Sequence, residues 1–253
     1  MSNGESTGAQ KAQPVTGQSE APLYSPQPSP ETVDASLSED RALALLKQPD
    51  LAVEIIEQVA RNGEILKYRK VRLALVQHPR TPRHLSLPLI RQLYTFDLMQ
   101  VSLTPTTPAD LKRVADEALC MRMETISSGE RLSLAHRASG LVAGALLMDA
   151  EARVVHAALE NPRLTEALVI KAMVSPKTPA HSVAAVCHHA LWSARREVRI
   201  ALLRSDKTPM AKAVEFARGL PPALLREILR NSRLPQQIKT YLLQDLAKPR
   251  SAH

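Results

Sequence analysis

Two stretches of this chain carry nearly the same phrase. VRLALVQHPRTP (71–82) and VRIALLRSDKTP (198–209) share six of their twelve residues, and their Thr-Pro pairs coincide. Extending the comparison without gaps, at an offset of 127, gives 14 identities in the 72 positions of 44–115 and 171–242. Self-similarity at a fixed offset is typical of chains that stack repeated structural units, so the fold is expected to be a repeat array.

Proline-containing turns give the units their length. The turns near residues 49, 79 and 105 are spaced by 30 and 26 residues, and the turns near 176, 206 and 232 repeat that spacing. Between them lie short segments with apolar residues at helical spacing. Thr81 and Thr208 are expected to cap the helix that follows each turn, with the next proline at its first position. Each unit is therefore predicted to be a helix, a turn and a second helix.

Composition supports helices rather than sheets. Apolar residues make up 44% of the chain but aromatic residues only 3%, and no alternating pattern of a β-strand persists. Leu, Ala, Val and Ile must then form the core, which suits closely packed helices. The sequence predicts an all-α fold, an α-solenoid of about a dozen helices in stacked antiparallel pairs.

The chain divides into three expected parts. Residues 1–38 are rich in Ser, Gln, Pro and Gly and are expected to form a disordered tail. The solenoid spans 39–247 and begins with Ser38 as a helix cap, and 248–253 form a C-terminal tail. The solenoid has two duplicated halves, 39–118 and 166–247, and an irregular middle segment, 119–165, joins them. There, Ser128-Gly129-Glu130 predicts a turn before a helix over 131–148.

At these residues the sequence resembles HEAT-like and leucine-rich-repeat-variant α-solenoids. The resemblance rests on the V-R-x-A-L helix, the N-P-x-x-[PT] or x-x-x-T-P turn and the Leu/Ala-rich second helix, most clearly over 71–93, 153–173 and 198–218. It covers roughly 41–246 and implies a right-handed superhelix that binds other molecules. Some leucine-rich-repeat-variant proteins carry a Cys-ligated iron–sulfur cluster, but this chain has only two cysteines. Some HEAT-like proteins are DNA glycosylases, whose site motifs we do not find here.

Arginines are the leading candidates for a binding surface. The net charge is +8, and because residues 1–38 carry −3, the rest of the chain carries +11. Arg69 and Arg72 match Arg196 and Arg199 in the duplication, and Arg195 lies beside the second pair. Equivalent positions of stacked repeats are expected to lie on one side of the array, which would make two basic patches facing the same way. The alternative is that these arginines bond neighbouring helix ends or cover apolar surface.

Tryptophan, histidine and cysteine provide the remaining candidates for a binding or metal site. Trp192 is a candidate interface anchor, although its counterpart Ile65 is apolar and favours a core role. The run Cys187-His188-His189 is a weak candidate metal site, because adjacent helical histidines point about 100° apart. Cys120 and Cys187 are more simply interpreted as buried free thiols. No metal and no cofactor are therefore expected.

The function expected from these residues is binding rather than catalysis. The chain contains no P-loop, dinucleotide fingerprint, G-x-S-x-G or H-E-x-x-H motif, so no catalytic residue is assigned. We expect a cytoplasmic scaffold that recognises a protein partner, acidic in character, without a membrane segment. Duplex nucleic acid bound by a basic concave face is the alternative, and a HEAT-like DNA glycosylase is the remote one. The oligomeric state is left open.

Overall fold

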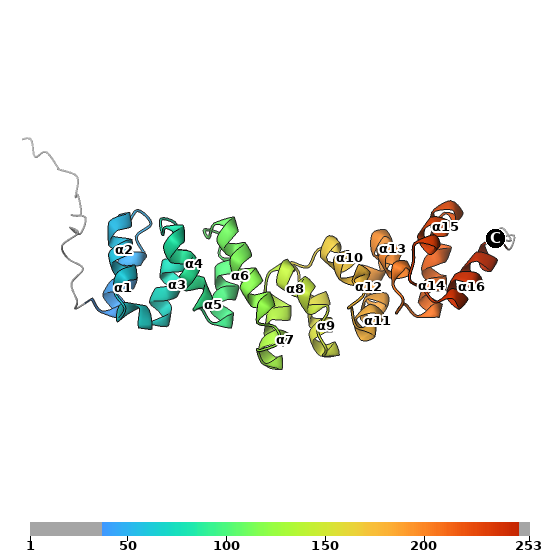
Figure 1. The fold of residues 1–253 in the computed structure, drawn as a ribbon, viewed down its shortest axis with the longest axis horizontal. Helices are drawn as coiled ribbons and strands as arrows, with labels where there is room; N and C mark the ends of the chain where they lie inside the picture. The colour runs from blue at the N-terminus through green and yellow to red at the C-terminus, as the bar shows by residue number, and fades with distance from the viewer. Residues whose placement is uncertain (1–36, 248–253) are drawn as a thin grey trace, which may run out of the picture. The chain divides into compact units, whose positions relative to one another are not determined.

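The all-α expectation is confirmed. A computed structural model describes residues 37–247, which form helices and turns and no β-strand, and all of them belong to one compact unit (Figure 1). The tails predicted for 1–36 and 248–253 lie outside the described residues. None of the helices in the described part of the chain combines the length and the apolarity needed to cross a membrane.

The helices are shorter and more numerous than the dozen expected. Residues 37–247 contain sixteen α-helices and one 3-10 helix, because several units are split by extra breaks. They are α1 (Glu39–Leu46), α2 (Val53–Arg61), η2 (Ile65–Lys67), α3 (Arg69–Gln77), α4 (Arg83–Arg91), α5 (Thr95–Leu103), α6 (Ala109–Met121), α7 (Ser128–Arg137), α8 (Gly140–Leu146), α9 (Ala152–Leu159), α10 (Glu166–Val174), α11 (Ala180–His188), α12 (Ala190–Ala194), α13 (Arg196–Arg204), α14 (Met210–Arg218), α15 (Pro222–Arg230) and α16 (Gln236–Ala247).

Helix starts follow the capping residues in two places. Ser38 caps α1 by accepting a hydrogen bond from the Arg41 backbone N–H at 3.3 Å. Ser127 and Glu130 form a capping box at the start of α7. The single helix expected over 131–148 is wrong, because α7 ends at Arg137 and Ser139 caps a separate helix, α8.

The Thr-Pro pairs act differently from the prediction. Thr81 and Thr208 do not cap the next helix, since the N-cap residues are Pro82 and Pro209. Each threonine is buried and donates its hydroxyl hydrogen bond backwards, to the carbonyl six residues earlier, over 2.6 Å. Thr178 makes the same bond to Ala172. The threonines thus bond carbonyls in the last turn of the preceding helix, two of which also accept a backbone N–H, from Ser175 and Ser205.

The helix bounds repeat at the offset found in the sequence. α2, α3, α4 and α5 each begin and end 127 residues before α11, α13, α14 and α15, and α6 begins 127 residues before α16. Identical bounds in four successive helices require turns of the same length in both halves. This agreement supports the proposal that the halves arose by duplication.

Helix contacts run in two rows. One row is continuous from α4 through α6, α8, α10 and α13 to α15. Opposite it, α1, α3 and α5 contact one another in turn, and so do α7, α9 and α11. Pairs such as α3 with α4, and α13 with α14, join the rows, and Figure 1 shows the helices following one another in sequence order. Contact between near neighbours alone is compatible with the predicted solenoid.

The rows place the two halves differently. α3, the first helix of its unit, belongs to the row of α1 and α5, whereas its equivalent α13 belongs to the row of α4 and α6. The three helices of the middle, α7 to α9, shift the later units by one helix. Equivalent helices of the two halves therefore lie in opposite rows.

Polar side chains at the turns tie successive units together. His78 donates from Nε2 to the Gln48 carbonyl at 2.9 Å, and Arg80 donates to the Asp50 carbonyl at 2.8 Å. Lys207, the equivalent of Arg80, donates to the Pro176 carbonyl at 3.1 Å. Part of the basic charge is thus used inside the array, where cations bond the ends of helices or turns.

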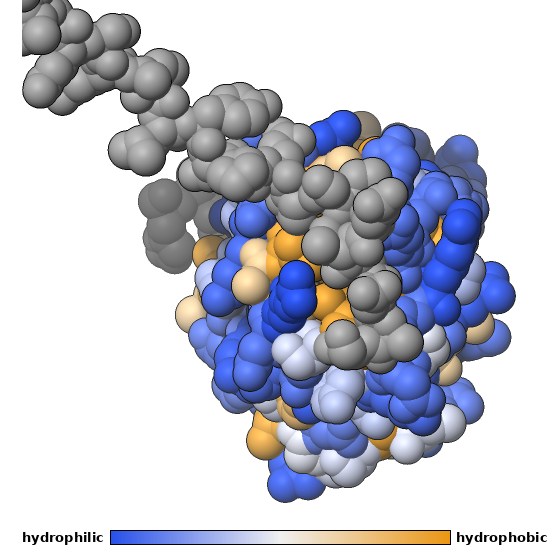
Figure 2. Space-filling model, turned by 90° about the vertical axis from the view of Figure 1, so that its left-hand side faces the viewer, coloured by the Kyte–Doolittle hydropathy of each residue, from blue (hydrophilic) through white to orange (hydrophobic). Residues whose placement is uncertain are grey.

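Apolar side chains form one core along the array. Leu, Val, Ala and Ile dominate it, and Phe216 is its largest fully buried side chain. Seen from the side where α1 and α2 lie, hydrophilic residues cover most of the visible described surface, with apolar residues exposed in smaller areas (Figure 2). A polar outer face is what the terminal unit of a repeat array needs for solubility.

Candidate functional site

Arg69 forms an ion pair that links two helices. Its Nε and one terminal nitrogen each lie 2.8 Å from an oxygen of Asp97 on α5, and the Asp97 side chain is 5% exposed. The same guanidinium lies 5.2 Å from the ring centre of Tyr94. The carboxylate raises the pKa of Arg69 above its ordinary value, first through the hydrogen bonds and then through its charge. Arg69 therefore has an internal partner already.

Arg72 and Arg199 are both half-buried, and they make different contacts. Arg199 donates from Nε to the Ser193 carbonyl at 2.6 Å and lies over the Phe216 ring at 5.6 Å. The Nε of Arg72 is buried and has no hydrogen-bond partner among the described residues. These contacts follow the alternative in which arginines bond helix ends and cover apolar surface.

Arg195 and Arg196 remain exposed. Arg195 lies 3.5 Å from a carboxylate oxygen of Glu166, with half of its side chain exposed. Arg196 pairs with no other described residue, because Leu224 occupies the position equivalent to Asp97. Arg69 is equally exposed, at 53%, so of the predicted arginines Arg196 alone combines exposure with the lack of a partner among the described residues.

The expected pair of patches facing the same way is not formed. Arg69 and Arg72 lie on α3, and Arg196 and Arg199 lie on α13, in the opposite row. The expectation assumed that every unit adds the same two helices in the same order. The extra helices of the middle break that assumption.

Trp192 is a core residue rather than an exposed anchor. Its side chain is 4% exposed, and its Nε1 donates to the Leu159 carbonyl at 3.0 Å. An indole that is buried and satisfied cannot meet a partner without unfolding its surroundings. The candidate role of Trp192 in binding is therefore corrected.

The Cys187-His188-His189 run has separate partners. Cys187 is buried, His188 bonds the Ala184 carbonyl at 2.8 Å, and His189 lies 3.0 Å from a carboxylate oxygen of Glu160. His181 bonds the Asp149 carbonyl at 2.9 Å. Within residues 37–247 no three His, Cys, Asp or Glu side chains are grouped so that they could hold a metal ion.

Both thiols should react slowly in the folded protein. Burial raises the pKa of Cys120 to about 11 and that of Cys187 to about 12, from an ordinary value of 9.0. The thiolate is the reactive form, so at pH 8 its fraction falls about 100-fold and about 1000-fold. We expect Ellman's reagent to label native protein far more slowly than protein in guanidinium. The Cys120→Ser variant isolates Cys187, and equal native and unfolded rates for that variant would contradict its burial.

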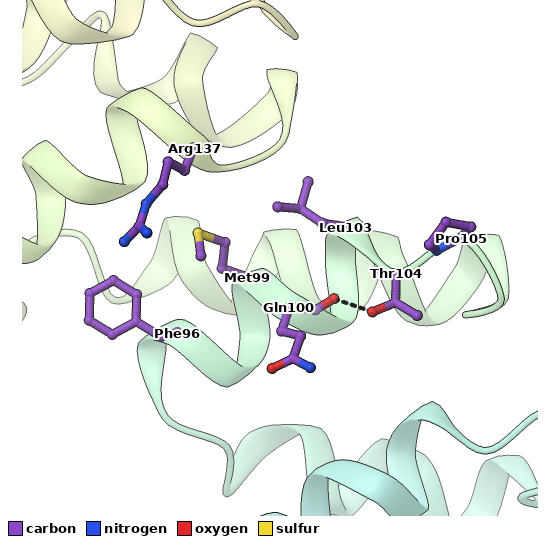
Figure 3. Close-up of a pocket in the computed structure, with 7 residues that line it drawn as sticks. All are labelled: Phe96, Met99, Gln100, Leu103, Thr104, Pro105 and Arg137. Atoms are coloured by element: carbon purple, nitrogen blue, oxygen red, sulfur yellow. Dashed lines mark hydrogen bonds between the residues drawn. The ribbon is translucent and has the colours of Figure 1, made fainter. Parts of the chain in front are cut away.

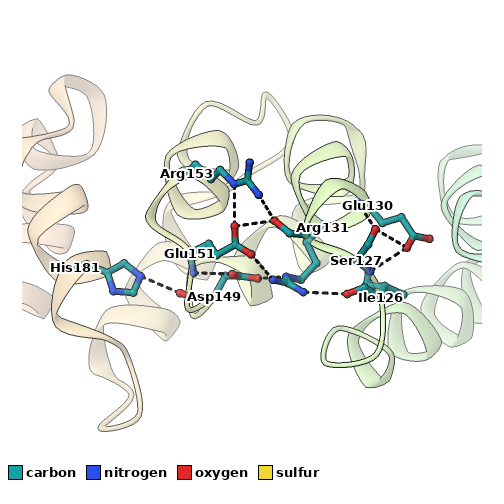
Figure 4. Close-up of polar contacts among 9 residues, drawn as sticks. Ile126, Ser127, Glu130, Arg131, Asp149, Glu151, Arg153 and His181 are labelled. Atoms are coloured by element: carbon teal, nitrogen blue, oxygen red, sulfur yellow. Dashed lines mark hydrogen bonds and ion pairs between the residues drawn. The ribbon is translucent and has the colours of Figure 1, made fainter.

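A charged cluster holds the irregular middle together (Figure 4). Arg131 of α7 lies 2.8 Å from a carboxylate oxygen of Asp149 and 2.8 Å from one of Glu151, and it donates to the Ile126 carbonyl at 3.0 Å. The side chains of Arg131 and Asp149 are 17% and 6% exposed. A hydrogen bond from Ser128, followed by Arg153, lowers the pKa of Glu151. The Nε of Arg131 is buried and meets Asp149 as an ion pair without hydrogen-bond geometry, and the cluster joins α7 to the loop before α9.

A groove between α5 and α7 is the strongest candidate for binding (Figure 3). α6 contacts α8 in one row, but α5 and α7 do not pack closely in the other. The space left between them is a pocket of about 500 Å³ that opens to solvent. Its lining residues are Phe96, Met99, Gln100, Leu103, Thr104, Pro105 and Arg137.

Most of the described residues that line the α5–α7 groove are apolar, and Arg137 is the only charged residue among them. Phe96 is 37% exposed, and Met99 and Leu103 follow it on the same side of α5. Arg137 extends from the end of α7 toward Phe96 and Met99, and it donates to the Ser133 hydroxyl at 2.6 Å (Figure 3). Phe, Met and Arg are enriched at the centres of protein interfaces.

Nothing in the sequence analysis singled out this groove. A usable signal was present, because the segment 95–103 has apolar residues at 98 and 101 on one face and at 96, 99 and 103 on another. A helix that is apolar on two faces must bury both or expose one. Which of the two happens depends on how closely α7 approaches, which is a property of the packed array.

No protein-family model, no curated protein and no solved structure matches this chain.

Proposed function

We propose that this protein is a non-catalytic binding scaffold, and that the α5–α7 groove receives an amphipathic helix of a partner protein. The observation that carries the proposal is the open apolar groove of about 500 Å³ with Arg137 at its edge. Helix recognition of this kind places apolar side chains, spaced by three or four residues, in a hydrophobic groove. Met99 and Leu103 would contact those side chains, and Arg137 would pair with a carboxylate at the edge.

The exposure of the groove supports this proposal. Contiguous exposed apolar residues are uncommon on soluble proteins unless they bind something. Methionine adapts to differently shaped partners because its side chain is unbranched and polarisable. Arg137 would add selectivity for acidic segments and faster association.

Nucleic-acid binding through the predicted arginines has less support. Arg69 and Arg199 already bond Asp97 and Ser193, and the two halves place their arginines in opposite rows. Duplex binding needs many cations that follow a phosphate backbone. The catalytic alternative gains no support from any pair of acids or nucleophile–base contact within residues 37–247.

Charge placed in the groove should abolish partner binding. Met99→Glu with Leu103→Glu introduces two carboxylates where apolar side chains would be buried, and we expect at least a tenfold loss of affinity. The readout is quantitative capture by wild type and variant, followed by titration of the purified captured partner. Met121→Glu is the matched control, because Met121 is 83% exposed and lies outside the groove.

A spectroscopic reporter ties the binding to the groove. The single native tryptophan, Trp192, is buried, so Phe96→Trp adds an indole whose emission reports the groove. Partner binding should shift that emission to shorter wavelength. Unchanged emission during saturable binding, or equal losses in the Met121→Glu control, would contradict the proposed site.

A further inference from the structure

A second groove lies between α15 and α16, at the C-terminal end of the described array. It has a volume of about 400 Å³. Its lining residues are Arg226, Leu229, Arg230, Gln236, Lys239 and Leu243. Three of the six are cations, two are leucines, and none is a carboxylate. A ligand in this groove would therefore meet positive charge beside apolar surface.

Two of the cations are unused within the array. Arg226 and Arg230 are exposed on α15, and neither makes an ion pair or a hydrogen bond with another described residue. Their spacing of four residues places both guanidinium groups on one side of the helix. Most other arginines discussed above bond a carboxylate or a carbonyl of a neighbouring unit, so this pair differs from them.

The first half of the chain shows which features the fold itself requires. Lys112 and Lys239 are equivalent, and they donate to the equivalent carbonyls of Pro105 and Ser232, at 3.3 and 2.6 Å. This lysine is therefore structural in both halves. Met99 and Leu103 occupy the positions of Arg226 and Arg230, so the same helix face is apolar in one half and basic in the other.

The groove is open because α15 and α16 pack less closely than their equivalents α5 and α6. In the first half, Asp116 of α6 accepts a hydrogen bond from Ser102 at 2.5 Å and another from Ser139 of the next unit. Leu243, the residue equivalent to Asp116, is 43% exposed instead. The polar contacts that close this place in the first half are thus replaced by an exposed leucine in the second.

We propose that the α15–α16 groove binds an acidic peptide segment of another protein, with an apolar side chain placed against Leu243. Each guanidinium would take a carboxylate through paired hydrogen bonds. Charge complementarity supports this partner, because every described charged residue that lines the groove is a cation. Phosphate backbones are a poorer fit, since three cations are too few to follow a duplex and none of the described lining residues is an aromatic that could stack on bases.

Such a site would make the chain bivalent. The two grooves lie on helices of different rows, and Figure 1 shows α5 and α15 well separated along the array. One molecule could then hold two partners at once and raise their effective concentration for each other. This inference does not depend on the α5–α7 groove, and either site can fail alone.

The equivalence of the two helix faces provides the test. Arg226→Met with Arg230→Leu gives α15 the side chains of α5, and Met99→Arg with Leu103→Arg makes the reciprocal change. The probe is a fluorescein-labelled peptide in which leucines alternate with aspartates, titrated into the full chain by anisotropy. We expect binding by wild type that weakens with salt, at least a tenfold loss in the α15 variant, and additional binding in the α5 variant, whose helix face has gained two arginines.

Four outcomes would overturn the proposal. They are equal binding by the α15 variant, equal binding of a peptide with lysines in place of the aspartates, no binding at millimolar peptide, and tighter, arginine-dependent binding of a 20-base-pair duplex. Sedimentation of wild type and the α15 variant adds a fifth, because an arginine-dependent dimer would make the groove an interface between copies. Matching circular dichroism spectra confirm that the variants are folded.

Discussion

Gly140→Ala should destabilise the protein by about 3 kcal/mol, the upper part of the range for overpacked cores. A methyl group at this position would lie 2.2 Å from the backbone oxygen of Arg163 and 3.1 Å from its carbonyl carbon. These are backbone atoms, so no side chain can rotate away. Either α8 or the turn before α10 would have to move.

The turn is held firmly. Asn161 is 4% exposed, and its side-chain amide donates to the carbonyls of Ala135 and Ala138 at 2.7 and 3.2 Å. Its own oxygen accepts from the Arg163 backbone N–H at 2.8 Å. Because two hydrogen bonds fix the turn against the end of α7 and a third holds the turn's own backbone, the cost of moving it adds to the cost of the collision.

Helix propensity alone predicts that Gly140→Ala stabilises the protein, so the two explanations predict opposite changes in stability. Alanine is favoured over glycine in a helix by about 1 kcal/mol. Gly129 of α7 has no atom within 4 Å of the position of an added methyl group, so Gly129→Ala is the matched control and should be neutral or stabilising. Thermal unfolding followed by circular dichroism should lower the Tm of Gly140→Ala by roughly 6–12 °C. Equal Tm values for the two variants would disprove the close approach.

Asp149→Ala should cost about 3 kcal/mol, because it leaves Arg131 with one carboxylate partner in a largely buried place. The Arg131 and Asp149 side chains are 17% and 6% exposed, so water cannot replace the lost oxygen easily. Glu151 still pairs with Arg131, which places the loss at the lower end of the range for breaking a buried ion pair.

A double variant that lacks both charges tests whether the loss in Asp149→Ala comes from leaving Arg131 unpaired. Arg131→Met with Asp149→Leu removes both charges and keeps apolar volume, and we expect it to be more stable than Asp149→Ala. Glu117→Gln is the exposed control, since Arg113 and Glu117 are 3.0 Å apart but 66% and 52% exposed, and it should cost less than about 0.5 kcal/mol. Urea unfolding gives all the values. A loss for Asp149→Ala no larger than the control would mean that the cluster contributes little.

The sequence specified the helices well because their ends are local. Pro82, Pro209 and the turn residues before them stop one helix and start the next wherever they occur, so the 127-residue offset of the sequence reappears in helix bounds. The threonines of these turns were assigned to the wrong helix. Their hydroxyls reach back six residues, which spacing alone does not distinguish from capping forward.

The site was less predictable because it depends on which helices approach one another. The sequence pairs Arg69 with Arg196 and Arg72 with Arg199. The row in which each arginine lies, however, depends on the number of helices between the two halves. Trp192, a candidate interface anchor from the sequence, is buried instead, and its apolar counterpart Ile65 was the sequence signal for that core position. The α5–α7 groove exists because two helices without a direct connection stay apart, and no local pattern encodes that separation.

The row exchange has a consequence for how such arrays can change. The row that each helix of the second half occupies depends on whether the number of helices in the middle is odd or even. The middle has three helices, α7 to α9, so every later helix lies in the row opposite to that of its equivalent in the first half. Loss or gain of a hairpin would preserve the relation, whereas loss or gain of one helix would reverse it. A single short insertion, without altering any contact residue, could thus decide whether two bound partners face each other or face away.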